Sequence, residues 1–146
     1  MKRPPALFCL RFLLFSLLVV LVACNTSVKD SSQKQHLSDQ VFAEQLKNRG
    51  SYDSAIIFFR KSVDYNLKNK QYTTWVESIS GMIDCFRAKG DLDQAMQITD
   101  QSLALAVTKI DTTGNLYNGL IHKKALLYSD KRQFAEASAL FNRNIR

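Results

Sequence analysis

An all-α fold is predicted for most of this 146-residue chain by three observations. From Ser38 onward, apolar residues recur at three- and four-residue steps, as they do along one face of a helix. No stretch shows the sustained alternation that is typical of a half-buried strand. Only five glycines and two prolines are present, which is few for the turns of an all-β protein. The length gives room for one domain of ordinary size, so we expect a single helical domain.

The positive charge of the chain is spread too thinly to indicate nucleic-acid binding. The formal net charge is +7, but Lys2, Arg3 and Arg11 lie in a leader that has no carboxylate. After this leader, 17 basic and 13 acidic residues remain, which gives a net charge of +4. Nucleic-acid binding needs basic residues gathered on one surface. We therefore expect no nucleic-acid partner.

The leader, residues 1–23, has the layout of a secretory signal peptide. Two basic residues near the start precede an apolar run of twelve residues, from Phe12 to Ala23. A secretory apolar segment has roughly 7–15 residues, whereas a membrane-spanning helix needs roughly 20. The run ends in LVAC at residues 21–24, which resembles the lipobox of bacterial lipoproteins.

The lipobox resemblance implies that Cys24 carries a thioether-linked diacylglyceryl group and that the leader is cut just before it. Each buried CH₂ of palmitate or a related acyl chain contributes roughly 0.8 kcal/mol, so two or three chains hold a protein firmly at a membrane. The alternatives are an ordinary signal peptide cut after an alanine and an uncleaved signal anchor. The resemblance implies lipid anchoring in a bacterial cell envelope, at the inner or the outer membrane.

The chain is expected to divide into the leader, a tether and a helical domain. Residues 24–37 combine the acylated cysteine with a polar segment rich in Ser, Lys and Gln, which predicts a flexible tether. Residues 38–146 form the helical domain. Since Cys9 leaves with the leader and Cys24 is acylated, Cys85 has no partner for an intramolecular disulfide. Its place in an apolar helical pattern predicts a small buried hydrophobe.

Local signals mark where the helices of this domain begin and end. Gly50 and Gly90 are chain-reversing residues, and Ser51, Asp91 and Gln133 are N-cap candidates. Longer connections are expected at residues 66–70 and 108–115. Together with the apolar periodicity, these signals predict six helices, at residues 38–49, 51–67, 71–89, 91–108, 113–130 and 133–146.

A motif repeats along the helical domain at residues 50–55, 90–95 and 132–137. Each copy combines a chain-reversing site, an N-cap candidate, an apolar anchor and an alanine that leaves space for closely crossing helices. Here the sequence resembles the tetratricopeptide repeat (TPR) family, particularly the longer version found in kinesin light chains. The residues that carry the resemblance are Ala43, Gly50, Tyr52, Ala55, Gly90, Ala95, Ala125, Tyr128, Phe134 and Ala137.

The TPR resemblance covers residues 39–146 and implies an α-solenoid of about three antiparallel helix pairs. A generic helical bundle is the alternative. The sequence departs from the family pattern at Leu46, Ile83, Leu92, Thr99, Arg132 and Asn144.

No catalytic constellation is present, so we expect neither an enzyme nor a cofactor apart from the lipid on Cys24. His36 lies in the tether, and His122 has no Cys or His at ligand spacing, so no metal site is expected. The phosphate-loop, dinucleotide and hydrolase motifs are missing. Asp91 and Asp93 begin a helix, where capping and the helix dipole account for them.

The TPR resemblance implies a binding groove lined by the first helix of each pair, with contacts from an i, i+4, i+7 stripe. The residues of this groove stripe are Gln40, Glu44, Lys47, Ser80, Asp84, Arg87, His122, Leu126 and Ser129. Family members that bind the C-terminal carboxylates of chaperones do so with Lys and Asn on this stripe. The groove stripe of this sequence therefore does not indicate chaperone binding. The mixed charges indicate an extended polar peptide or a partner helix, and the alternative is a solvated face without a ligand.

The last helix has no capping helix after it, although repeat arrays normally require one. Leu140 and Ile145 are therefore expected to be incompletely covered. A partner, a second copy in a homodimer through the last repeat, or further sequence of a longer array would cover them.

These features predict a membrane-anchored TPR lipoprotein that acts as a protein–protein interaction scaffold, with a protein or peptide as its ligand. The alternative is a truncated sensory or regulatory TPR region of a larger signalling protein. A third option is a subunit of an envelope assembly complex.

Overall fold

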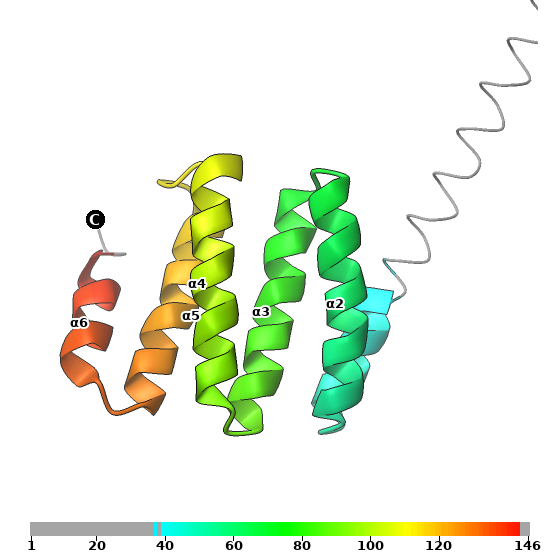
Figure 1. Cartoon of the computed structure of the whole chain (residues 1–146), viewed down its shortest axis with the longest axis horizontal. Helices are drawn as coiled ribbons and strands as arrows, with labels where there is room; N and C mark the ends of the chain where they lie inside the picture. The colour runs from blue at the N-terminus through cyan, green and yellow to red at the C-terminus, as the bar shows by residue number, and fades with distance from the viewer. Residues whose placement is uncertain (1–36, 38, 144–146) are drawn as a thin grey trace, which may run out of the picture. The chain divides into compact units, whose positions relative to one another are not determined.

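In the computed structural model, residues 37 and 39–143 are described, and they lie within one compact unit that spans His36–Arg146. No strand occurs in this part of the chain, which confirms the all-α prediction. A helical segment at 39–48 precedes five helices: α2 (Tyr52–Lys68), α3 (Tyr72–Ala88), α4 (Leu92–Lys109), α5 (Asn115–Asp130) and α6 (Phe134–Arg143) (Figure 1). The predicted leader, the acylated Cys24, most of the tether and Ile145 lie outside the described residues.

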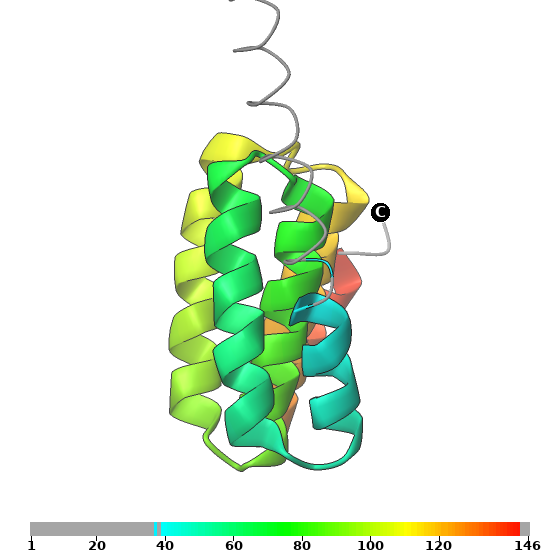
Figure 2. The ribbon, with the colours of Figure 1, turned by 90° about the vertical axis from the view of Figure 1, so that its right-hand side faces the viewer.

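Consecutive helices pack against one another along the repeat domain. α2 packs on α3, α3 on α4, α4 on α5 and α5 on α6, and α3 also contacts α5. Figures 1 and 2 show α2 and α4 on one side, with the first helical segment and α5 behind them. The first helical segment, α3 and α5, which begin the three pairs, thus form one layer, and α2 and α4 form the other, as expected for an α-solenoid.

Most helices begin one or two residues later than predicted. Ser51 and Asp91 stand at the N-cap positions of α2 and α4, as predicted, although their side chains make no capping hydrogen bond. α5 begins at residue 115 because Asp111 holds the preceding turn. Its Oδ1 accepts hydrogen bonds from the backbone N–H and the hydroxyl of Thr113, at 2.9 and 2.8 Å. α6 was predicted to reach residue 146, and its described part ends at Arg143.

Four helices end in the same backbone turn, which takes a residue with positive φ. That residue is Gly50 (φ 76°), Lys70 (59°), Gly90 (78°) or Arg132 (61°). In each turn, the N–H of the next residue donates to the carbonyl five residues before it, at 2.8–2.9 Å. This bond satisfies a carbonyl that the end of a helix leaves free. Arg132, a departure from the family pattern in sequence, therefore has the same backbone conformation as the two glycines.

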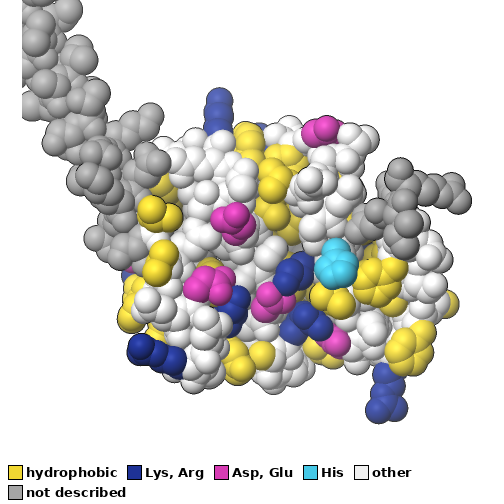
Figure 3. All heavy atoms as spheres, turned by 180° about the vertical axis from the view of Figure 1, so that it is seen from behind, with side chains coloured by type: hydrophobic (Ala, Val, Ile, Leu, Met, Phe, Trp, Pro, Cys, Tyr) yellow, Lys and Arg dark blue, Asp and Glu magenta, His cyan; other side chains and the backbone are white. Residues whose placement is uncertain are grey.

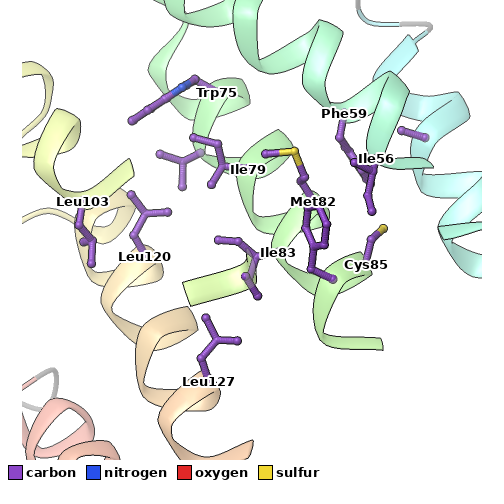
Figure 4. Close-up of a cluster of buried hydrophobic side chains, with 14 of the residues drawn as sticks. Ile56, Phe59, Trp75, Ile79, Met82, Ile83, Cys85, Leu103, Leu120 and Leu127 are labelled. Atoms are coloured by element: carbon purple, nitrogen blue, oxygen red, sulfur yellow. The ribbon is translucent and has the colours of Figure 1, made fainter. Parts of the chain in front are cut away.

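The hydrophobic core runs through all three pairs. Its largest fully buried side chains include Phe59 on α2, Trp75 on α3, and Leu120 and Leu127 on α5 (Figure 4). The repeat alanines at positions 43, 55, 95 and 125 have no exposed surface, and Ala137 is also buried. The repeat alanines therefore lie in the packed interior of the array.

A buried polar cluster joins α2 to α3. The Ser62 and Ser78 hydroxyls lie 2.8 Å apart, and the Asn66 side-chain amide donates to the Ser62 oxygen at 2.9 Å. The Ser78 hydroxyl donates to the carbonyl of Thr74 at 2.8 Å, so the proton between the two serines belongs to Ser62. Each buried hydroxyl thus has a partner, and the cluster does not carry the cost of unpaired polar groups.

Candidate functional site

The groove stripe lies on the layer of first helices. Residues 40, 44 and 47 are on the first helical segment, residues 80, 84 and 87 are on α3, and residues 122, 126 and 129 are on α5. Figure 3 shows the molecule from behind, where acidic and basic side chains gather near the centre with apolar side chains around them. This layer therefore presents a surface of mixed charge.

An ion network at the centre of the groove stripe links α3 to α5. The Lys123 ammonium donates to both carboxylate oxygens of Asp84, at 2.7 and 2.6 Å. Arg87 Nε donates to Asp130 Oδ2 at 2.7 Å, and its Nη1 lies 3.6 Å from Asp84 Oδ1. Two cations and two carboxylates thus balance one another across two repeats.

The electrostatics of Arg87 reflect this pairing. The hydrogen bond to Asp130 raises the pKa of the guanidinium above its usual range, although partial burial acts in the opposite direction. Nearby charge on Asp84 adds to the increase. Because each charged group of the network already has a partner, the network is a poor clamp for a single free anion or cation.

A hollow of about 460 Å³ adjoins the network. It is lined by Asp84, Arg87, Ala88, Gly90, Leu92 and Asp130. Two of the stripe residues, Asp84 and Arg87, line this hollow together with Asp130, which the sequence analysis did not identify. Lys123 lies 39 residues after Asp84, and Asp130 lies 43 residues after Arg87, which is close to the repeat length in both cases. Opposite charges at this spacing were the sequence signal that could have indicated the two ion pairs.

At the N-terminal end of the stripe, the polar side chains contact α3 and each other. Gln40 Nε2 donates to Glu77 Oε2 at 3.3 Å, while Gln40 Oε1 is buried and lacks a hydrogen-bond partner among the described residues. Glu44 pairs with Lys47 at 2.5 Å, one helical turn away. Lys47 also lies 5.8 Å from the centre of the Phe59 ring. This end of the stripe is therefore also balanced in charge.

On α5 the stripe residues are arranged differently. His122 is exposed, and its ring lies edge-on to Phe141 of α6, with 5.4 Å between ring centres. Leu126 and Ser129 are half-buried. His122 is thus placed beside the last helix of the array, and it does not line the hollow next to Arg87.

The described residues offer few groups for covalent or metal chemistry. In this part of the chain, no three His, Cys, Asp or Glu side chains group as a metal site requires. Cys85 has no exposed surface, and burial raises the pKa of its thiol to about 11. A protonated, buried thiol is a weak nucleophile. None of the helices at 39–143 is both long and apolar enough to span a membrane.

Comparisons with known proteins identify the fold. No protein-family model and no curated protein matches the chain. A crystal structure of TPR-like repeats from a Podosopora anserina kinesin light chain matches with a TM-score of 0.67 at 17% identity, over 76% of this chain and 54% of that one. The TPR domain of Arabidopsis FLU matches with a TM-score of 0.65 at 14% identity, over 77% of this chain and 93% of that domain.

The chain therefore has a TPR-like fold, as its repeated motif predicted. It spans about half the length of the Podosopora anserina structure. Stacked helical repeats of this kind provide extended surfaces for binding other proteins, and the fold is typical of interaction scaffolds.

Proposed function

We propose that this chain is a membrane-anchored scaffold of a bacterial cell envelope, which binds a protein or peptide along its layer of first helices. The proposal rests on the mixed-charge surface of the first helices (Figure 3) and on the hollow beside it, which α3, α5 and the start of α4 line. A lipid on Cys24 would fix the location. The part of the predicted tether that precedes the helical Leu37, residues 24–36, would give a reach of about 45 Å when extended.

The ion network favours one kind of ligand over another. Since Asp84, Arg87, Lys123 and Asp130 neutralise one another, a ligand of single charge gains little net attraction from them. An extended polar peptide with its own donors and acceptors can bind beside these charges without leaving any of them unpaired. Polar complementarity of this kind contributes more to specificity than to affinity.

Photocrosslinking tests whether the groove is used. A photoreactive amino acid replaces Ser80, which belongs to the groove stripe but not to the ion network. The matched control replaces Gln97, an exposed residue of α4 on the other layer. In whole cells we expect covalent adducts from position 80 and not from position 97. Absence of adducts at position 80, or equal adducts at both, would contradict the proposed groove.

A second candidate is self-association through the last repeat. A hollow of about 430 Å³ opens between α4, α5 and α6. It is lined by Leu103, Ala104, Val107, Tyr117, Ile121 and Leu140 together with Asp100 and Lys124, which form an ion pair. The half-buried state of Leu140 agrees with the expected incomplete cover. Light scattering tests this candidate: a dimer that Ala104→Arg converts to a monomer supports it, whereas a monomeric wild-type chain excludes it.

A further inference from the structure

Two ion pairs recur at the same place in successive repeats. Lys89 pairs with Asp53, and Lys131 Nζ lies 2.5 Å from Asp93 Oδ1. In both pairs, the aspartate is in the first turn of a second helix, and the lysine follows the first helix of the next repeat. In both cases the carboxylate thus lies on the second helix of one pair, which packs against the first helix of the following pair.

The first repeat has the cation of this series without the carboxylate. Arg49 precedes Gly50 as Lys89 precedes Gly90 and as Lys131 precedes Arg132. Its side chain makes no hydrogen bond or ion pair with the residues that the structure describes, and it is exposed. The end of the first helical segment therefore presents a guanidinium in a position where the other two repeats bind a carboxylate.

Apolar side chains lie on the same segment. Val41 is 51% exposed and Phe42 41% exposed, and Leu37 is also exposed. Forty residues later, the equivalent positions hold Gly81 and Met82, which α2 covers: Gly81 lies under the ring of Phe59, and Met82 is 6% exposed. No described helix takes the place of α2 on the first helical segment.

We propose that this first-helix face, made of Leu37, Val41, Phe42 and Arg49, docks an amphipathic α-helix of another protein. The helix lies as α2 lies on α3, with an Asp or Glu of its first turn on Arg49 and an apolar stripe on Val41 and Phe42. Charge complementarity and the internal repeats carry this assignment. The face is separate from the groove stripe, so the proposal goes beyond the groove.

The repeats also indicate the size of the contacting side chain. Where α3 has Gly81, α2 supplies the ring of Phe59; at the equivalent positions α5 has Lys123 and α4 has Thr99. Val41 has a side chain where α3 has Gly81, so it leaves no space for a ring such as that of Phe59. The docked helix should therefore resemble α4, which has the smaller Thr99 at the position of Phe59. A second copy fits less well, since α6 carries Phe141 at that position and Ala135 in place of the aspartate.

A peptide of residues 91–109 is the probe for this face, because α4 has both the first-turn Asp93 and the small Thr99. A staple between positions 97 and 101, both exposed in α4, forms the helix before binding. The labelled peptide is titrated with the full-length chain in nanodiscs, and fluorescence anisotropy reports binding. We expect saturable binding that Val41→Asp weakens at least about tenfold, because it charges the apolar contact.

Two matched variants make the test specific. Arg49→Asp should weaken binding about threefold or more, and a peptide with Asp93→Lys should recover it on that variant. Gln97→Asp adds the same charge at an exposed residue of α4, on the other layer, and should leave binding unchanged.

Three results would overturn the proposal: no saturable binding, binding that neither Val41→Asp nor Arg49→Asp weakens, or self-association of the wild-type chain that Val41→Asp abolishes. The last result would assign the face to a second copy. Absence of crosslinks at position 80 with intact peptide binding would refute the groove and support the first-helix face. Crosslinks at position 80 without peptide binding would support the groove and refute the first-helix face.

Discussion

The ring of Phe59 in α2 lies directly against the backbone of Gly81 in α3. A Cβ atom built on Gly81 would lie 2.4 Å from Cζ and 2.6 Å from Cε1 of this ring. Phe59 has no exposed surface, so close-packed neighbours leave the ring little space to move. The first two repeats therefore approach as closely as they do because residue 81 lacks a side chain.

Gly81→Ala should lower the free energy of unfolding by about 1–3 kcal/mol. The added methyl group overpacks the interface, and this cost exceeds the gain of about 1 kcal/mol that alanine brings to a helix interior. Urea denaturation followed by circular dichroism measures the change.

Gly119→Ala is the matched control for this substitution. Gly119 lies inside α5, and nothing lies within 4 Å of a Cβ built there. Here only the helix propensity changes, so the free energy of unfolding should rise by about 0.5–1 kcal/mol. Equal effects of the two substitutions would show that the contact with Phe59 is unimportant.

Arg132→Gly should stabilise the protein by about 1 kcal/mol. Arg132 has φ 61°, a left-handed conformation that costs a residue with a Cβ roughly 1–2 kcal/mol and costs glycine little. The reverse change, Gly90→Ala, imposes the same strain at φ 78° and should destabilise by a similar amount. Denaturation midpoints compare the two, and a destabilising Arg132→Gly would refute the equivalence of these turns.

Asp84→Lys should destabilise the packing of α3 on α5 by about 1–3 kcal/mol, because it brings three cations together where Lys123 and Arg87 now share a carboxylate. Lys123→Asp combined with Asp84→Lys should recover part of this loss. A double-mutant cycle in thermal unfolding measures the coupling. Additive effects would contradict the ion network. Charge reversal at position 84 thus changes stability as well as the groove.

Cys85 should make stability depend on pH between about 9 and 11. Burial raises the pKa of its thiol from 9.0 to about 11, with smaller contributions of opposite sign from Lys47 and of the same sign from Asp84. The folded state therefore holds this proton more tightly, so the stabilisation is complete below pH 9 and is lost as pH rises toward 11. The free energy of unfolding of residues 25–146 should fall more steeply over this range than that of Cys85→Ala. Identical pH profiles would exclude the effect.

Cys24→Ser should move the protein from the membrane to the soluble fraction, because it removes the thiol that would carry the lipid. Fractionation of cells with immunoblotting measures this, and mass spectrometry of the wild-type protein reports the acyl mass. If the variant stayed at the membrane with its leader removed, the lipid anchor would be refuted.

Local sequence signals were enough to predict the helices and the repeat. Gly50 and Gly90 mark turns because few other residues adopt positive φ, and the buried alanines follow the same period. The turn at Arg132 was predictable only from the repeat, since an arginine gives no local sign of a left-handed backbone. The close approach at Gly81 was also missed, because the family pattern expects the small residue at position 83, where a fully buried Ile83 stands.

The contacts of the candidate site could not be predicted in the same way. The pairs Asp84–Lys123 and Arg87–Asp130 join residues about one repeat apart, and they form only where the crossing of α3 and α5 brings the side chains together. Single exposed charges along a helix do not indicate which neighbour they meet. The groove stripe was therefore predictable as a set of positions, while its charge balance required the packed helices.

We expect the three repeats to form a self-supporting array that can serve as a scaffold. Thermal unfolding of residues 25–146, followed by far-ultraviolet circular dichroism, tests it most directly. We predict a strongly helical spectrum and one cooperative transition, since a continuous core joins the helix pairs. A weakly helical chain that aggregates or melts without a transition would contradict the claim.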